Sequence, residues 1–339
     1  MDTSRWSGRR DVNARACRLR NAALAAVMLA IGAFAPAGAR AEWPERPVTL
    51  IVIAGAGGGS DFTMRLLARE LESGLKQPFT VVNQPQASGV VGMTNYTRAA
   101  PDGYTLGQIA PFAQYRLSGQ ANFAPASFTP IAQFNADPAA IHVGRDSPLK
   151  SVGDVIAKLK QDPASLKISC GGTCNASWDI PFLSLLIDQG VDVAKVNLIP
   201  AQGSAAGLQE LASGGVDIVL CSLPETDALA SAGKVRSIGV MSEKRLDRYP
   251  GVATIGEQIG KAYVGGTWRG IAGPPGIDPQ VAARIEAAVK RAFDSEAFQK
   301  GMKERGFGAV WRGREELAAF MVEHDAMTTR VMQAVAPKN

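Results

Sequence analysis

From residue 47 onward the chain alternates short β-rich runs with segments of helical periodicity, and this alternation limits the possible folds more than any other feature. The run "VTLIVIA" is followed by "DFTMRLLARELESGL", in which apolar residues recur near helical spacing, and then by "FTVVN". The same order continues to "VDIVLCS" and "VRSIGVM". Alternation of this kind predicts an α/β fold, with mostly parallel sheets that helices cover on both faces.

Further helices are expected at residues 151–162, 176–189 and 204–214. The turn "GPPGIDPQ" predicts a helix that begins at Pro279, and the amphipathic stretch 313–335 predicts a long final helix.

Three loops each follow a predicted strand and precede a predicted helix: "AGAGGGSD" (54–61), "CGGTCNAS" (170–177) and "CSLPET" (221–226). In α/β sheets ligands bind at the carboxyl ends of the strands, where loops lead into helix N-termini. These loops are therefore the candidate ligand-binding segments.

The first forty residues have the pattern of a secretory signal peptide. Arg9, Arg10, Arg15, Arg18 and Arg20 precede an Ala/Leu-rich core at residues 22–34, and "APAGARA" supplies a cleavage site between Ala41 and Glu42. The core is about thirteen residues long, too short for a permanent membrane helix, which needs roughly twenty. We expect a soluble protein exported to the periplasm.

The positive charge of the chain belongs to this signal. Residues 1–41 carry seven Lys/Arg and two Asp/Glu, so the remainder has 36 − 7 = 29 basic and 31 − 2 = 29 acidic residues. A chain without net charge gives no support to a nucleic-acid or anionic-membrane partner. The remaining 298 residues, from 339 − 41, suggest two domains.

Three cysteines, Cys170, Cys174 and Cys221, remain after the signal. In an oxidising compartment they predict either one disulfide with a free thiol or three buried thiols. Cys170 with Cys174, or Cys174 with Cys221, are the candidate pairs, and the sequence does not choose between them. With only two histidines, His142 and His324, we expect no zinc site and no other metal or cofactor.

The opening glycine loop nearly matches a dinucleotide-binding motif, but the third glycine is Ser60 and the next strand lacks an acid for the ribose. The chain also lacks the lysine of a P-loop. An exported hydrolase is the other enzymatic alternative, yet there is no G-x-S-x-G elbow. His142 lies in a predicted strand and His324 in the final helix, so neither offers an obvious base. We expect no catalytic residues.

Anion capture by the main chain is the interpretation that remains. A glycine loop that opens a helix presents unpaired N–H groups at the positive end of the helix dipole, and glycine lets a ligand approach closely. Such a loop suits one carboxylate, and "GGTCNAS" suits a second carboxylate or a polar group. The alternative is that the glycines only make tight turns.

A series of short motifs, in order along the chain, resembles the Bug family, the substrate-binding proteins associated with tripartite tricarboxylate transporters. The motifs are "WPERPVTLIV", the Gly-Gly-x-x-Asp loop, "VVNQPQASGVVG", "AAPDGYTLG", "FTPIAQF", "GGVDIVLCSLP", "AGKVRSIGV" and "GIAGPPGIDP". The resemblance implies a two-domain periplasmic binding protein, or Venus flytrap, that closes on a small carboxylate. Its expected parts are the signal peptide 1–41, a first domain of 42–142 plus 265–339, and a second domain of 143–264.

The resemblance also implies ligand-binding positions, in which the first loop holds a carboxylate through backbone groups and ordered water. Asp61 is expected to cap the helix and shape the loop, because an acid is a poor partner for an anion. Arg269, after Trp268, could supply a bidentate contact, or it could be exposed or paired with a local acid. The expected ligand-binding residues are Ala56, Gly57, Gly58, Gly59, Ser60, Asp61, Thr173, Cys174, Asn175, Ala176, Cys221, Ser222 and Arg269.

The departures from the family pattern fall in the loops that choose the ligand. "IAG" at 53–55 stands where Pro-Phe-Pro is usual, and "IPAQGS" at 199–204 lacks the usual aromatic and cation. Loss of side chains at Ala54 and Ala201 predicts a larger cleft and suggests a bulkier acid, aromatic or amide-bearing. Trp178 and Trp268 could stack on a ring, or pack in the core.

These observations predict a binding protein without catalysis, which captures a di- or tricarboxylate, or an aromatic or amide-bearing acid, by domain closure. The expected partner is an integral-membrane permease of the transporter. A sensor that signals to a membrane receptor is the alternative, and an exported hydrolase is a further one. We expect a monomer.

Overall fold

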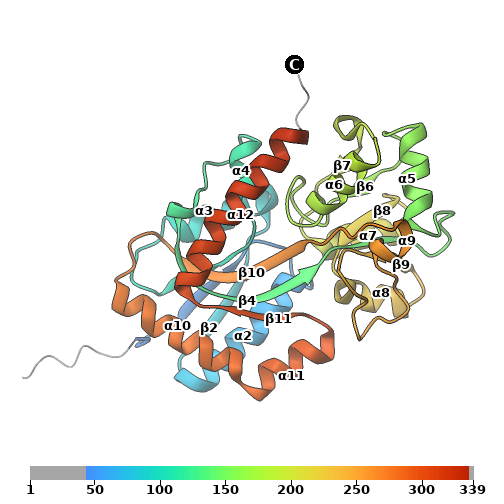
Figure 1. Ribbon diagram of the computed structural model, residues 1–339. Helices are drawn as coiled ribbons and strands as arrows, with labels where there is room; N and C mark the ends of the chain where they lie inside the picture. Colours follow the sequence, from blue (N-terminus) through green and yellow to red (C-terminus); the bar gives the residue numbers. More distant parts are fainter. Residues whose placement is uncertain (1–42, 336–339) are drawn as a thin grey trace, which may run out of the picture. The chain divides into compact units, whose positions relative to one another are not determined.

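The computed structural model describes residues 43–335 (Figure 1). The predicted signal peptide, with its cleavage site after Ala41, lies outside this range. The architecture below is that of residues 46–335. In residues 43–335, no helix combines the length and the apolar character that a membrane crossing requires.

The first lobe is built on a six-stranded sheet of order β11-β4-β10-β3-β1-β2. β1 pairs in parallel with β2 and β3, but β10 is antiparallel to β3 and β4, and β11 is antiparallel to β4. The sheet is therefore mixed, where we expected a mostly parallel one, because strands from the C-terminal part of the chain join it. The strands are β1 (Val48–Val52), β2 (Phe79–Asn83), β3 (Thr105–Ile109), β4 (Thr129–Pro138), β10 (Gly266–Gly273) and β11 (Ala309–Arg312).

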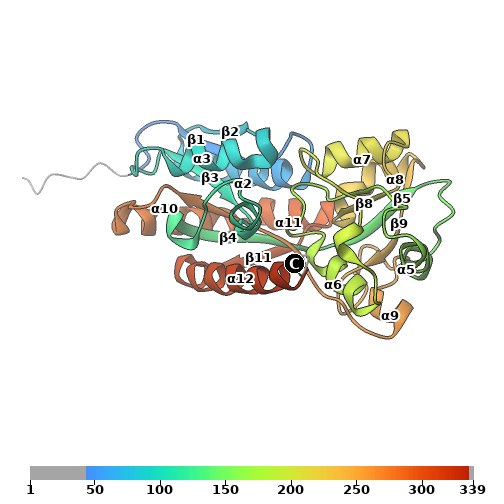
Figure 2. The same ribbon diagram turned by 90° about the horizontal axis from the view of Figure 1, so that it is seen from above.

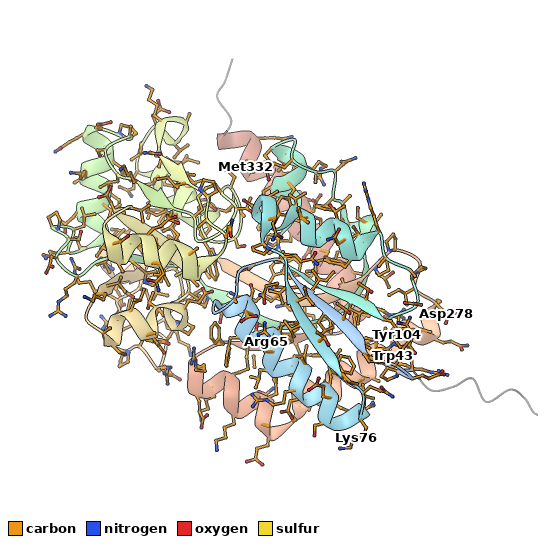
Figure 3. All side chains as sticks on the ribbon, turned by 180° about the vertical axis from the view of Figure 1, so that it is seen from behind. Trp43, Arg65, Lys76, Tyr104, Asp278 and Met332 are labelled. Atoms are coloured by element: carbon orange, nitrogen blue, oxygen red, sulfur yellow. A yellow bond between two sulfur atoms is a disulfide. The ribbon has the colours of Figure 1, made fainter. Side chains whose placement is uncertain are left out.

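Helices cover both faces of this sheet. In Figure 1, α3, α4 and α12 lie on one face and α2, α10 and α11 on the other. α2 begins beside the second lobe and runs away from it, past Arg65 to Lys76 (Figure 3). The helices are α2 (Gly59–Leu75), α3 (Val90–Thr97), α4 (Ala113–Leu117), α10 (Pro279–Asp294), α11 (Glu296–Arg305) and α12 (Arg314–Val335), with 3₁₀ turns η1 (Gln86–Gly89) and η2 (Pro125–Ser127).

The second lobe has a five-stranded mixed sheet of order β7-β6-β8-β5-β9. β6 is parallel to β7 and β8, whereas β5 is antiparallel to β8 and β9. Figure 2 shows α7 and α8 on one side and α5, α6 and α9 on the other. Its elements are β5 (Ala140–Gly144), α5 (Val152–Gln161), β6 (Ile168–Ser169), α6 (Ile180–Asp188), η3 (Val193–Lys195), β7 (Leu198–Ile199), α7 (Ser204–Ser213), β8 (Ile218–Cys221), η4 (Leu223–Thr226), α8 (Asp227–Ser231), β9 (Val235–Val240) and α9 (Ile255–Ile259).

Two crossing segments join the lobes side by side. β4 runs into β5 with only Ala139 between them. The N–H of Ala139 donates to the carbonyl oxygen of Gly265, the residue that precedes β10, at 2.8 Å. A Cβ on Gly266 would lie 2.0 Å from Asp137 O, so glycine is required for this close pairing. The expected boundary between residues 142 and 143 therefore falls inside β5.

Local sequence explains several element boundaries. α10 begins at Pro279 as expected, since the Asp278 side chain accepts N–H bonds from the first turn and proline suits the N1 position. α12 also matches its expected range. α6 begins at Ile180, four residues later than expected, because Asp179 accepts the N–H groups of Asn175 and Ala176 and holds them in a turn.

Candidate functional site

A cavity of about 90 Å³ lies between the two lobes, at the carboxyl ends of β1, β2, β3, β6 and β7. If a water needs about 10–15 Å³ on this measure, the cavity holds roughly six to nine water-sized groups. It therefore suits a small ligand. Its lining residues are Ile53, Ala54, Gly55, Gly58, Gly59, Ser60, Pro85, Ser88, Ala110, Pro111, Gln114, Tyr115, Gly171, Gly172, Thr173, Ala176, Ser177, Trp178, Ala201, Gln202, Gly203, Ser204, Glu225, Thr267 and Arg269.

The glycine loop reaches the cavity at Ala54 and Gly55 and again from Gly58 to Ser60. Asp61 turns away and shapes the loop: its Oδ2 accepts the N–H of Gly57 at 3.0 Å, where Gly57 has a φ of 83°, and its Oδ1 accepts from Arg65 at 2.8 Å. Gly58 precedes the first turn of α2, whose N–H groups have no partner within the helix. This end of the helix can bind an anion.

Arg269 is buried at the floor of the cavity, with 2% of its surface exposed. Its neighbour Trp268 packs into the opposite face of the sheet, as the alternation of strand side chains requires. The pairing of β10 with β4 shifts register directly after Arg269, and such irregularities redirect side chains next to binding sites.

The guanidinium of Arg269 is held by protein groups. Nη1 donates to Asp137 Oδ2 at 2.7 Å and to Asn135 Oδ1 at 2.5 Å. Nε donates to Ser60 Oγ at 3.1 Å, and Nη2 lies 3.4 Å from Glu225 Oε1. Arg269 thus lines the cavity and also pairs with local acids, so most of its guanidinium N–H groups already have protein partners.

Burial raises the pKa of Asp137, and the positive charge of Arg269 opposes this effect. The carboxylate also accepts the Gly308 N–H at 2.8 Å and an N–H of Asn135 at 3.0 Å. Removal of Arg269 would leave this carboxyl buried without its cation.

The loop after β6 contains a disulfide between Cys170 and Cys174, which resolves the two pairings left open by the sequence. Cys221 is a buried free thiol, and its burial raises its pKa well above the ordinary value. Thr173 reaches across the cleft, where its hydroxyl donates to Ser88 O at 3.0 Å.

The third loop places Glu225, which the sequence analysis did not single out, against the first lobe. Its Oε1 accepts the Gly59 N–H at 2.9 Å, and its Oε2 accepts the backbone N–H and hydroxyl of Ser222 at 3.1 and 2.8 Å. The Ser-x-x-Glu spacing of a capping box was the available sequence signal. No motif in the neighbouring sequence predicts that Glu225 contacts the other lobe.

Six of the thirteen expected ligand-binding residues line the cavity: Gly58, Gly59, Ser60, Thr173, Ala176 and Arg269. The other seven do not line it: Ala56, Gly57, Asp61, Cys174, Asn175, Cys221 and Ser222. Gln114, Tyr115, Ser204 and Glu225 are lining residues that the sequence analysis missed.

The expected enlargement of the cleft at Ala54 and Ala201 stays a prediction, and both residues line the cavity. The two loops approach each other, and the Gly55 N–H donates to Gln202 O at 3.0 Å across the cleft. A Cβ on Gly55 would lie 2.9 Å from that oxygen. The backbones of the two loops are therefore in contact next to Ala54 and Ala201.

Trp178 lines the cavity, with its ring centroid 5.8 Å from the Arg269 guanidinium carbon. Trp268 instead packs against Phe320 and His324, and it borders a second, apolar cavity of about 450 Å³ beside the crossing strands. Ile180 and Pro181, at the start of α6, also line this second cavity.

Neither histidine lines the cavity between the lobes. Burial lowers the pKa of both His142 and His324 to about 4, and the His142 ring contacts Ser237 Oγ and Cys221 O. Within residues 43–335, no group of three or more His, Cys, Asp or Glu side chains is placed to hold a metal ion.

The two lobes, the crossing strands and the cavity between them define the class of two-domain periplasmic binding proteins. Comparison with known proteins is consistent with this class. The solved structure of MatC from Rhodopseudomonas palustris with bound malate is 25% identical, with a TM-score of 0.78 over 86% of this chain and 100% of that chain. The periplasmic binding protein BugD is also 25% identical, with a TM-score of 0.77 over 86% of this chain and 98% of that one.

The family model of the tripartite tricarboxylate transporter family receptor matches residues 63–336. A protein of Cupriavidus necator, described as a UPF0065 protein in the gbd 5' region, is 29% identical over 306 residues, which cover 89% of this chain and 92% of the relative. The chain belongs to the tripartite tricarboxylate transporter receptor family, and the resemblance found in its motifs is confirmed. The family is one of substrate-binding receptors.

Proposed function

We propose that the protein is a periplasmic solute-binding receptor that captures a small carboxylate by closure of its two lobes and delivers it to the permease of a tripartite tricarboxylate-type transporter. The observation that carries this proposal is the cavity between the lobes, with the N-terminal ends of α2 and α7 contributing residues from opposite sides. Helix N-termini stabilise negative charge. The malate in the related MatC structure gives further support.

The proposal includes export through a signal peptide, residues 1–41, and action as a monomer. It also includes two domains, 42–142 plus 265–339 and 143–264. We place the first crossing at Ala139, where β4 passes into β5, and the second at Gly265. The two crossings are hydrogen-bonded to each other, so they are suited to act as one hinge.

A thermal-shift screen of residues 42–339 against mono-, di- and tricarboxylates tests the binding function. A ligand at 100 times its Kd adds about 2.7 kcal/mol to the free energy of unfolding, which corresponds to a rise in Tm of several degrees. Silence across all acids, with a hit from nucleotides or uncharged compounds, would refute the proposal.

Two further measurements address the alternatives. Deletion of the permease should abolish uptake of the identified ligand; persistent ligand-dependent signalling without the permease would favour the sensor. Recovery of the ligand unchanged after incubation is expected of a receptor, and turnover would indicate a hydrolase.

A further inference from the structure

Glu225 of the second lobe already supplies a carboxylate to the N-terminal end of α2. Its two oxygens accept the Gly59 N–H and both donors of Ser222, and Arg269 lies 3.4 Å away. A carboxylate has about four acceptor positions, so these contacts satisfy it. Its side chain is 3% exposed. The place where a ligand carboxylate would contact both the helix end and the arginine is thus occupied by the protein itself.

No net positive charge remains at the floor of the cavity. Arg269 is the one Lys or Arg side chain among the residues that line it in the described part of the chain. It contacts two buried acids, Asp137 and Glu225. With both acids ionised the cluster has a charge of +1 − 2 = −1, and with Asp137 protonated it is neutral.

The remaining polar groups suit a ligand of low charge. Ser60 Oγ accepts N–H groups from Arg269 and Gln108, so its hydroxyl hydrogen is left to donate. Gln114 has the opposite need: its Nε2 donates to Pro111 O, but its buried Oε1 has no partner among the described residues. Gln114 is 2% exposed and lines the cavity, so a ligand N–H or O–H would satisfy this oxygen.

We propose that the site selects a small acid with one carboxylate and an N–H or O–H donor, such as an amide, over di- and tricarboxylates, and that Glu225 sets this preference. A second ligand carboxylate would be buried close to Glu225 without a free cation, which is costly. An amide in its place adds no charge and supplies the donor that Gln114 lacks. This inference rests on the proposed function, and it distinguishes the chain from MatC with its bound malate.

The test is titration calorimetry with pairs of ligands that differ only in one group. Succinate with succinamate, and glutarate with glutaramate, each exchange a carboxylate for an amide. Residues 42–339 should bind the amide member at least about tenfold more tightly, the change that ~1.4 kcal/mol of repulsion produces. Glu225→Gln removes the charge and should reduce this ratio about tenfold. Asp227→Asn removes a charge just outside the cavity, where Asp227 pairs with Arg248 and Tyr249, and should leave the ratio unchanged.

Equal or tighter binding of the dicarboxylate to the wild-type protein overturns the inference. An unchanged ratio in a folded Glu225→Gln variant overturns the role of Glu225. If Glu225→Gln does not fold, Ser222→Ala is the second variant, because it keeps the charge of Glu225 but removes one of its hydrogen-bond donors. This variant should retain the preference for the amide, and loss of the preference would contradict the proposal. If neither ligand pair binds, the proposed specificity is wrong. The proposed function fails only if no acid of the wider panel binds either.

Discussion

Gly59 stands at the point where α2, Glu225 and Arg269 meet, so Gly59→Ala gives a sharp test of the closed site. A Cβ at this position would lie 2.7 Å from Glu225 Oε1, 2.8 Å from Arg269 Nη2 and 2.8 Å from Phe307 Cε1. Cβ atoms essentially never come within 3.0 Å of such neighbours. The three groups cannot all move aside, because hydrogen bonds hold the two charged side chains and Phe307 stacks on Phe62.

The magnitude follows from the balance of two effects. Overpacking of a close contact costs about 1–3 kcal/mol, and alanine in place of glycine in a helix returns up to about 1 kcal/mol. Glu225 belongs to the other lobe, so opening of the cleft relieves its part of the clash. We therefore expect most of the net cost, about 1–2 kcal/mol, as a loss of ligand affinity of roughly 5- to 30-fold.

Gly74→Ala is the matched control, because it makes the same change in the same helix. A Cβ at Gly74 has no atom within 4 Å, so this variant should keep its affinity and gain up to about 1 kcal/mol of unfolding free energy. Calorimetry with the tightest acid of the panel measures the affinities, and urea unfolding measures stability. Wild-type affinity in Gly59→Ala would refute the reasoning that the closed lobes meet at this glycine.

The remaining predictions concern the second lobe. Burial raises the pKa of Asp179 from 3.8 to about 7, so its contribution to stability is full below pH 3.8 and is lost as the pH rises to 7. Relative to Asp179→Asn, the unfolding free energy of the wild-type protein should fall by up to ~4 kcal/mol from pH 4 to 7.5. A difference that stays constant with pH would contradict this prediction. Replacement of Cys170 and Cys174 by alanine opens a five-residue loop and should cost about 2 kcal/mol in urea unfolding; no loss would show that the loop is held by other contacts. Thiol titration of residues 42–339 without reductant should find no reactive thiol in the folded protein and one, Cys221, in denaturant. A mass-spectrometric assignment of the free thiol to Cys170 would show that the pairing is different.

The sequence was sufficient for the fold class because periodicity and capping act locally. The buried side chains of α5 recur at helical spacing after the N-cap Ser151, and those of α10 after Asp278, so both helices could be predicted from a few neighbouring residues. The mixed character of the sheets could not, since the direction of β10 beside β3 depends on contacts between residues more than 150 positions apart.

The candidate site was predictable to the same extent. The loops that line the cavity follow strands and precede helices, and the sequence marks such positions. Which side chain faces the cavity depends on geometry within the loop. Asn175 has a φ of 58° and follows the disulfide, and it does not line the cavity, although its neighbours Thr173 and Ala176 do. Cys221 ends β8 and is buried without lining the cavity, and no spacing rule separates it from Glu225, which contacts the other lobe.

The contacts between the two lobes stabilise the closed form of the protein even without a ligand. Among the described residues, hydrogen bonds cross the cleft from Gly55 to Gln202, from Thr173 to Ser88 and Tyr115, and from Gly59 and Arg269 to Glu225. Each contributes about 0.5–1.5 kcal/mol, and more where a charged group takes part. A ligand shifts the open–closed equilibrium only by its differential affinity for the two states. Because the protein itself supplies part of the closing free energy, we expect the closed form to be populated before binding. The unliganded protein should then become more extended in small-angle scattering when Glu225→Gln weakens one of these contacts, and an unchanged radius of gyration would show that the lobes close without its help.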